Sequence, residues 1–157
     1  MELMKLYIET TIPNFLFADD APEKRRVTEV FFEWLKLSDH KLCTSEVVFE
    51  ELTAAPEVKR SKLLSTLSDL KPAILEVTPE AASLCQFYLN RRILPPRYYN
   101  DAIQIALCVC HEVDYLATWN MRHMANVFRQ EKINQASLEF GLRSIRIVTP
   151  EQLIYED

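Results

Sequence analysis

The stretch Tyr98–His123, YYNDAIQIALCVCHEVDYLATWNMRH, decides the fold. Its first half repeats apolar residues at helical spacing on most sides, which is typical of a helix covered by its neighbours. Its second half contains 113–118, a run too short for a helix and rich in β-formers, which predicts a core strand. Because about 11 helical residues and about 5 strand residues both span roughly 16 Å, Asp101 is expected to lie level with Asn120.

Length and composition limit the class of protein. A chain of 157 residues predicts one domain spanning 1–157, and 48% hydrophobic with 26% charged residues indicates an ordinary soluble globular protein. No apolar run approaches the ~18 residues of a membrane span, and the start MELMKLYIE carries no signal-peptide pattern. We therefore expect a cytoplasmic protein that makes no membrane contact.

Several kinds of site are disfavoured by residue counts. The four cysteines, without a secretion signal, are expected to be reduced core residues, and the three histidines lack the spacing of a zinc site. The single glycine, Gly141, excludes a phosphate-binding loop and a dinucleotide fingerprint, both of which need several glycines. The net charge of −5 argues against a general nucleic-acid coat protein, though not against a localised basic rim.

Strand and helix patterns alternate along the chain. Strands are expected at 4–9, 41–44, 73–77, 113–118 and 144–148. Helices are expected at 27–37, 46–55, 58–70, 78–90, 100–111, 133–140 and just after Thr149. Ser45 is expected to cap the helix 46–55, and Gly141 to end the helix 133–140. The alternation predicts an α/β fold, a three-layer α/β/α sandwich with a central parallel sheet of about five strands.

One acid in the helix 46–55 is unusually placed. Glu51 falls within the apolar half of this helix, whereas Glu46 and Glu50 point away from it. A carboxylate that faces a core carries a desolvation cost unless a cation or a metal meets it. The alternative is that Glu51 lies at the edge of the apolar stripe and reaches water.

Four oxygen-bearing side chains are expected at one edge of the sheet, where the carboxyl ends of parallel strands form sites. Glu9 ends the first strand, Glu51 lies in the helix that leaves the second, Asp101 begins the helix that returns to the fourth, and Asn120 follows the fourth. Carboxylates without nearby histidine or cysteine suit Mg²⁺ or Mn²⁺, which activates water and neutralises charge on a phosphate. For Asp101 alone, the alternative is a simple interaction with the helix dipole.

These residues resemble the PIN-domain nucleases, especially the small prokaryotic VapC-like toxins of toxin–antitoxin pairs. The matching segments cover nearly the whole chain in the family's order: YIETT (7–11), TSEVVFEEL (44–52), NDAIQIAL (100–107), DYLATWNMRH (114–123) and IRIVTPEQL (145–153). The resemblance implies a five-stranded parallel sheet between helices, and hydrolysis of phosphodiester bonds, usually in RNA, that depends on Mg²⁺ or Mn²⁺. It also implies a homodimer and a small antitoxin protein as partner.

The resemblance assigns catalysis and metal binding to Glu9, Glu51, Asp101 and Asn120. The family normally has aspartate at the first and fourth of these positions. Glutamate at position 9 extends the carboxylate by one methylene, enough to shift a metal by about an ångström, and asparagine at position 120 removes a charge. Two functions follow: a metal-dependent endoribonuclease, or a catalytically impaired PIN-like domain that binds RNA or protein.

Cationic and aromatic residues flank the expected site. Arg91, Arg92 and Arg97 precede Asp101, and Arg122 follows Asn120, so these four arginines are predicted to contact RNA. The alternative for each is ordinary solvated charge. Tyr98, Tyr99 and Trp119 are candidates for stacking on bases, although Trp119 is expected to pack against the sheet edge.

Overall fold

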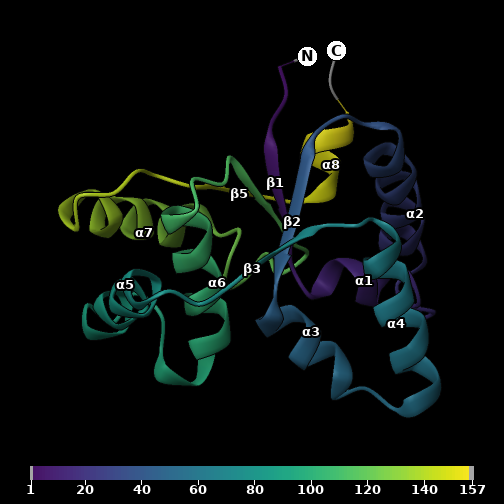
Figure 1. The fold of residues 1–157 in the computed structure, drawn as a ribbon, viewed down its shortest axis with the longest axis horizontal. Coiled ribbons are helices and arrows are strands. Elements are labelled where there is room, and N and C mark those ends of the chain that lie inside the picture. The colour runs from purple at the N-terminus through teal and green to yellow at the C-terminus, as the bar shows by residue number, and fades with distance from the viewer. Residues whose placement is uncertain (1, 156–157) are drawn as a thin grey trace.

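The centre of the structure is an all-parallel sheet of five strands in the order β3-β2-β1-β4-β5. The computed structural model describes residues 2–155 (Figure 1). The strands are β1 (Lys5–Ile8), β2 (Lys41–Ser45), β3 (Ala73–Leu75), β4 (Tyr115–Ala117) and β5 (Arg146–Val148). Each lies within its predicted range, except that β2 ends one residue later, so the predicted parallel sheet is confirmed.

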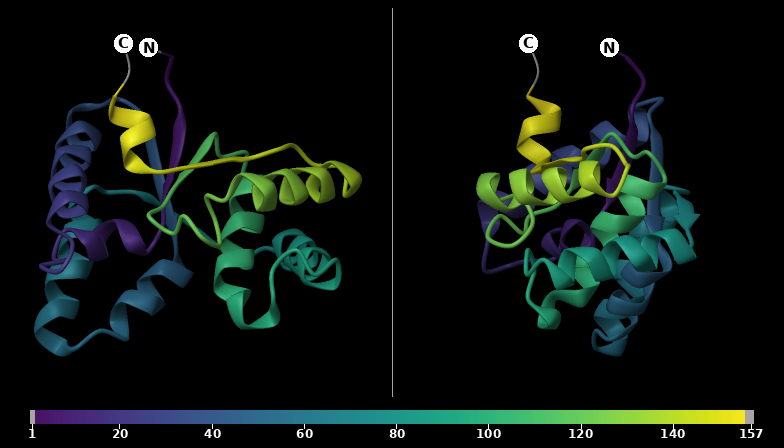
Figure 2. Two further views of the ribbon diagram at one scale, coloured as in Figure 1. Left: turned by 180° about the vertical axis from the view of Figure 1, so that it is seen from behind. Right: turned by 90° about the vertical axis from the view of Figure 1, so that its left-hand side faces the viewer.

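Helices cover both faces of the sheet, as the two opposite views in Figures 1 and 2 show. One face carries α1 (Thr11–Phe15), α2 (Pro22–Leu37), α4 (Glu57–Asp69) and α8 (Pro150–Ile154). The other carries α5 (Pro79–Asn90), the short η1 (Pro96–Tyr98), α6 (Tyr99–Cys110) and α7 (Val127–Glu139). The helix α3 (Glu46–Thr53) continues directly from β2 and packs on α4. The predicted three-layer α/β/α architecture is confirmed.

The core is built around β1 and α6. Leu6, Tyr7 and Ile8 of β1 are buried, and so are all eight residues 102–109 of α6. A helix apolar on most sides is stable only when neighbours cover it, and α6 packs against α5. The buried helix expected from the opening stretch is therefore present.

The two predictions for helix ends have different outcomes. Gly141 follows α7 with φ +89°, so this expected helix end is confirmed, and at the start of α5 the Thr78 hydroxyl accepts a hydrogen bond from the Ala81 amide. Ser45 precedes α3, but it makes no capping bond. Its hydroxyl instead bonds to the Tyr7 hydroxyl at 2.7 Å, because a buried phenol needs a partner.

Two parts of the helical layer differ from the prediction. The structure has the short helix α1, which the sequence pattern did not indicate, and α2 begins at Pro22 rather than at residue 27. The helix α7 begins at Val127, six residues before the predicted start, and the Asn126 side chain caps it by accepting the Arg129 amide. The first turn of α7 is largely exposed, so apolar periodicity alone could not locate it.

The edge of the sheet that matters for function is the one that β1 and β2 reach as they lead into α1 and α3. This edge lies low in Figure 1, whereas the N- and C-terminal ends lie at the top. The four cysteines are free, as expected. Within residues 2–155, no helix is both long and apolar enough to cross a membrane.

Candidate functional site

Glu9 is a buried carboxyl group at the end of the central strand. It follows β1, its backbone amide bonds to the Ala117 carbonyl of β4, and the residue is only 3% exposed. Its Oε1 accepts hydrogen bonds from the amide and hydroxyl of Thr11 and from the Thr118 hydroxyl, the last at 2.7 Å. The ends of β1 and β4 thus fix the orientation of this acid.

Glu51 faces the same edge from α3. Its Oε1 accepts a hydrogen bond from the Thr10 hydroxyl at 3.0 Å and another from the Gln104 amide at 3.1 Å. These partners come from the segment after β1 and from α6. Glu51 is therefore directed at the sheet edge and does not simply extend from the apolar stripe into water.

Asp101 and Asn120 lie side by side, as the lengths of helix and strand predicted. The Asn120 Nδ2 donates to Asp101 Oδ2 at 3.4 Å. The Asn120 Oδ1 accepts the His123 backbone amide at 3.0 Å, which closes the turn after β4. Because its oxygen is engaged by the backbone, Asn120 presents a hydrogen-bond donor, not a negative charge, to Asp101.

Burial raises the pKa of all three acids, and the charge of a neighbouring acid adds to this effect at Glu9 and Asp101. Burial raises the pKa of Glu9 to about 7, against the hydrogen bonds from Thr11 and Thr118 that lower it, and the charge of Asp101 raises it further. Burial and the charge of Glu51 raise the pKa of Asp101 to about 6. Burial also raises the pKa of Glu51. A nearby cation would relieve this repulsion and stabilise the ionised carboxylates.

The fit to a metal ion rests on donor chemistry. Among residues 2–155, no group of three histidine, cysteine, aspartate or glutamate side chains is arranged as a ready-made metal site. In the structure, Oε1 of Glu9 and of Glu51 instead accept hydrogen bonds from the protein. The three partly or fully desolvated carboxylates nevertheless match the oxygen ligands that a hard divalent cation prefers.

A buried hydrogen-bonded chain behind Glu51 was not predicted. The Tyr7 hydroxyl donates to Gln104 Oε1 at 2.9 Å and bonds to the Ser45 hydroxyl, while Gln104 Nε2 donates to Glu51. Tyr7, Ser45 and Gln104 are all inaccessible to solvent. The available signal was a lone polar residue, Gln104, one turn after Asp101 in an otherwise apolar helix.

Arg129 is the second functional candidate that the sequence interpretation missed. Its Nη1 donates to His123 Nδ1 at 3.2 Å and to the His123 carbonyl at 3.4 Å. Its positive charge lowers the pKa of Asp101 against the larger effect of burial. Because α7 was expected to begin at 133, Arg129 was assigned to a loop and given no role.

The four arginines predicted to contact RNA divide into two groups. The Arg97 guanidinium lies 4.9 Å from the centre of the Tyr98 ring, and the charges of Arg97 and Arg122 help to lower the pKa of His123, so both lie on the site's side. Arg91 instead pairs with Glu139 at the far end of α7, and Arg92 occupies the turn after α5 with φ +56°. The structure therefore brings Arg97 and Arg122 near His123, whereas Arg91 and Arg92 lie elsewhere, and RNA contact by any of the four stays a prediction.

The three aromatic residues considered for base stacking lie in different environments. Trp119 is buried, and its Nε1 donates to the Thr28 hydroxyl at 2.9 Å, so its expected packing role is confirmed. Tyr98 is half-buried and lies against His123, with ring centres 4.1 Å apart. Tyr99 is exposed.

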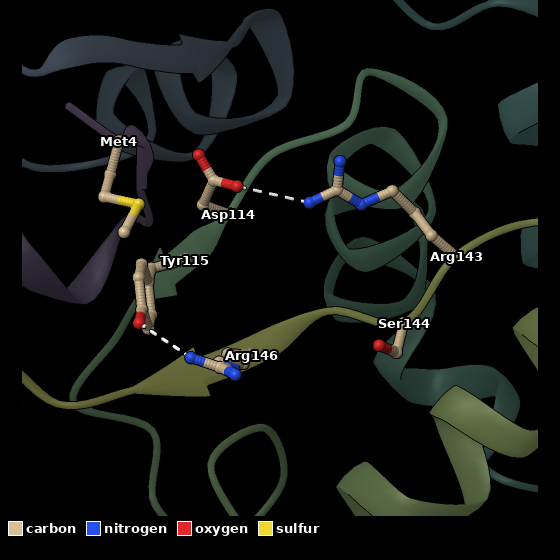
Figure 3. A pocket seen from close by; sticks show the side chains of 6 residues that line it. All are labelled: Met4, Asp114, Tyr115, Arg143, Ser144 and Arg146. Atoms are coloured by element: carbon tan, nitrogen blue, oxygen red, sulfur yellow. Dashed lines mark hydrogen bonds and ion pairs between the residues drawn. The ribbon is translucent and has the colours of Figure 1, made fainter. Parts of the chain in front are cut away.

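A cavity at the opposite edge of the sheet is separate from the acids (Figure 3). Its volume is about 270 Å³, and it is lined by Met4, Asp114, Tyr115, Arg143, Ser144 and Arg146. Asp114 pairs with Arg143 at 3.2 Å and accepts the Lys5 backbone amide, while Arg146 donates to the Tyr115 hydroxyl. Asp114 therefore joins the starts of β1 and β4.

Comparison with known proteins identifies the fold. No protein-family model and no curated protein matches the sequence. One similar solved structure is VapBC2 from Rickettsia felis bound to a DNA fragment from its promoter, with a TM-score of 0.56, 12% identity, and 93% of this chain and 98% of that chain covered. Another is VapBC-5 from Mycobacterium tuberculosis, a member of the VapBC family of toxin–antitoxin systems, with a TM-score of 0.52, 17% identity and the same coverage.

The fold is PIN-like. The parallel sheet between two helical layers and the similarity over 93% of the chain support this assignment together. At 12% and 17% identity the similarity concerns the fold, so the chemistry depends on the residues at the carboxyl edge of this PIN-like sheet.

The raised pKa values predict how stability depends on pH. In the metal-free protein, Glu9 and Asp101 favour folding while protonated, so their contribution is complete below about pH 4 and is lost as pH rises through about 6 to 7. In Glu9→Gln, the free energy of unfolding should fall by less than in wild type over this pH range, and the difference should be on the order of 3 kcal/mol. Urea unfolding in EDTA from about pH 4.5 to 8 measures the difference, with the exposed Glu151→Gln as control. Parallel curves for wild type and Glu9→Gln would contradict the assignment.

The buried chain behind Glu51 gives a second prediction. Gln104→Leu removes a donor to Glu51 and an acceptor from Tyr7, and should lower the free energy of unfolding by about 1–3 kcal/mol. The exposed Gln135→Leu on α7 is the matched control and should change stability by less than about 0.5 kcal/mol. Equal effects of the two substitutions in urea unfolding would show that the hydrogen bonds of Gln104 make no net contribution to stability.

Proposed function

We propose that the protein is an endoribonuclease that depends on Mg²⁺ or Mn²⁺ and hydrolyses phosphodiester bonds in RNA. The observation that carries the proposal is the convergence of Glu9, Glu51 and Asp101 at the carboxyl edge of a parallel sheet, each with a pKa raised by burial. Placing unpaired acids together is costly unless they serve a cation. The PIN-like fold supports the same assignment.

In this proposal, Glu9, Glu51 and Asp101 hold the cation. When bound, such an ion activates water and neutralises the charge that develops on the phosphate. The rest of the chain keeps the acids in place: Thr11 and Thr118 hold Glu9, and Thr10 and Gln104 hold Glu51. Well-oriented ligands reduce the cost of organising the site for reaction.

Asn120 has a different role from the carboxylates. Its amide donates to Asp101, which favours the ionised form of that acid, while its oxygen holds the turn after β4. Three negative charges can neutralise one divalent cation, but they are too few to neutralise two divalent cations. We therefore propose a one-cation site, with Asn120 as a positioning residue for Asp101.

The proposed physiological setting is a toxin–antitoxin pair. The similar solved structures come from such pairs, and a small antitoxin is the proposed partner here. Three large apolar side chains, Met121, Val127 and Phe128, are 49%, 64% and 75% exposed in the segment between Asn120 and Arg129. This apolar surface suits a protein partner. Homodimer formation and a cytoplasmic location stay predictions.

A second candidate function is a PIN-like domain that binds RNA or protein without cutting. The absence of a ready-made group of three metal ligands among the described residues favours it. So does glutamate, with its longer side chain, at position 9. The two candidates differ in one property, cleavage that depends on a metal.

The cleavage test compares purified wild-type protein with Asp101→Asn on unstructured RNA in Mn²⁺, Mg²⁺ or EDTA. We expect cleavage with either cation and none in EDTA, and at least about a 100-fold loss in Asp101→Asn, because the acid flanked by both others is neutralised. Asp20→Asn, at an exposed position, is the matched control and should keep full activity. Wild-type protein that leaves RNA intact in Mn²⁺ would favour the binding domain.

A further inference from the structure

Two aromatic rings from separate segments meet beside the acids. Tyr98 ends η1, just before α6, and His123 lies between β4 and α7. Their ring centres are 4.1 Å apart and their planes differ by 30°, and both side chains are partly accessible. In the described structure the pair is not enclosed in the core, unlike the neighbouring Trp119.

Arginine side chains surround this aromatic pair. Arg97 lies over the Tyr98 ring at 4.9 Å, and Arg129 donates to His123 Nδ1 at 3.2 Å. The charges of Arg129, Arg122 and Arg97 each help to lower the pKa of His123, which places all three around the imidazole. In a chain of net charge −5, this is a local concentration of positive charge.

The aromatic pair is linked directly to the acids. The His123 backbone amide donates to Asn120 Oδ1, and Asn120 Nδ2 donates to Asp101. Asn120 alone therefore separates the pair from the acid that interacts with both others. Whatever binds on Tyr98 and His123 lies next to the proposed reaction centre.

The aromatic pair and the surrounding arginines have the chemistry needed to bind a single nucleotide. Because Arg129 donates to Nδ1, His123 is a neutral imidazole, whose ring face can stack on a base. Guanidinium groups bind phosphate oxygens through paired N–H donors. They would also offset the repulsion between the three acids and the phosphates of an approaching strand.

We propose that Tyr98, His123, Arg97, Arg122 and Arg129 form a nucleotide subsite that takes one unpaired base and its adjoining phosphates. This inference rests on the proposed function for the identity of the strand as RNA. The subsite sets which nucleotide beside the cleaved bond must be unpaired, because a base in a duplex cannot present its face to the Tyr98–His123 pair.

The test uses a series of short fluorescent RNAs, each with one abasic residue at a different position. Binding is followed by anisotropy in EDTA, so that cleavage does not interfere. For wild-type protein, one abasic position should weaken binding by about 10-fold, since base stacking contributes on this scale. His123→Ala should weaken binding of the intact RNA by a similar factor and remove the dependence on that position. His123→Phe, which keeps an aromatic ring, should restore both the affinity and the dependence on that position.

The arginines are tested through salt dependence. Arg129→Gln should weaken binding of every RNA in the series alike and reduce the slope of log affinity against log salt by about 0.7, the expected value for one contact on a single strand. Arg146→Gln is the matched control, because Arg146 also lies over an aromatic ring, Tyr115, but at the opposite edge of the sheet. It should leave affinity and slope unchanged.

The outcomes separate this inference from the proposed function. If wild-type protein cuts RNA but His123→Ala shows the wild-type abasic profile, the subsite is wrong and the nuclease stands. A different outcome is that wild-type protein cuts no RNA but binds more weakly when one particular position is abasic, and that His123→Ala removes this dependence. In that case the subsite stands and the nuclease is wrong. Wild-type protein that binds none of the RNAs overturns the subsite. Unfolding curves of each variant confirm that the compared proteins are folded.

Discussion

The burial of Glu9 between the ends of β1 and β4 is the constraint on which the site depends. Thr11 and Thr118 hold its carboxyl group in place, yet burial still raises its pKa to about 7. The charge of Asp101 raises the pKa of Glu9, and the charge of Glu51 raises the pKa of Asp101, so a cation beside Asp101 would stabilise the ionised forms of these neighbouring acids. The surrounding hydrogen bonds, from Thr10, Gln104 and Asn120, keep these acids at the edge in spite of their mutual repulsion.

The fold was largely predictable because its elements are strongly patterned. Alternating strands and helices predicted the parallel sheet, and the apolar helix with its following strand correctly placed Asp101 level with Asn120. The placement of the acids followed from topology, since parallel strands bring their carboxyl ends together. The predicted participation of Glu9, Glu51 and Asp101 in one site agrees with their electrostatic interactions, while their metal binding stays a prediction.

The details that were missed depend on side-chain direction, which periodicity does not contain. Gln104 is one polar residue in a buried helix, and only the structure shows that it links Tyr7 to Glu51. Arg129 was missed because the exposed start of α7 carries no apolar stripe, so its capping residue Asn126 was not recognised. The hydrogen bond from the His123 amide to Asn120 Oδ1 could not be inferred from spacing either, and metal binding by Asn120 stays a prediction.

The central claim is that Glu9, Glu51 and Asp101 share one divalent cation. A crystal grown with Mn²⁺ and measured near the manganese absorption edge tests it directly, because anomalous scattering locates the ion independently of the protein atoms. The account predicts one strong peak about 2.0–2.6 Å from carboxylate oxygens of all three acids. Carboxylates more than about 8 Å apart, or a Mn²⁺ peak found only elsewhere on the protein, would contradict it.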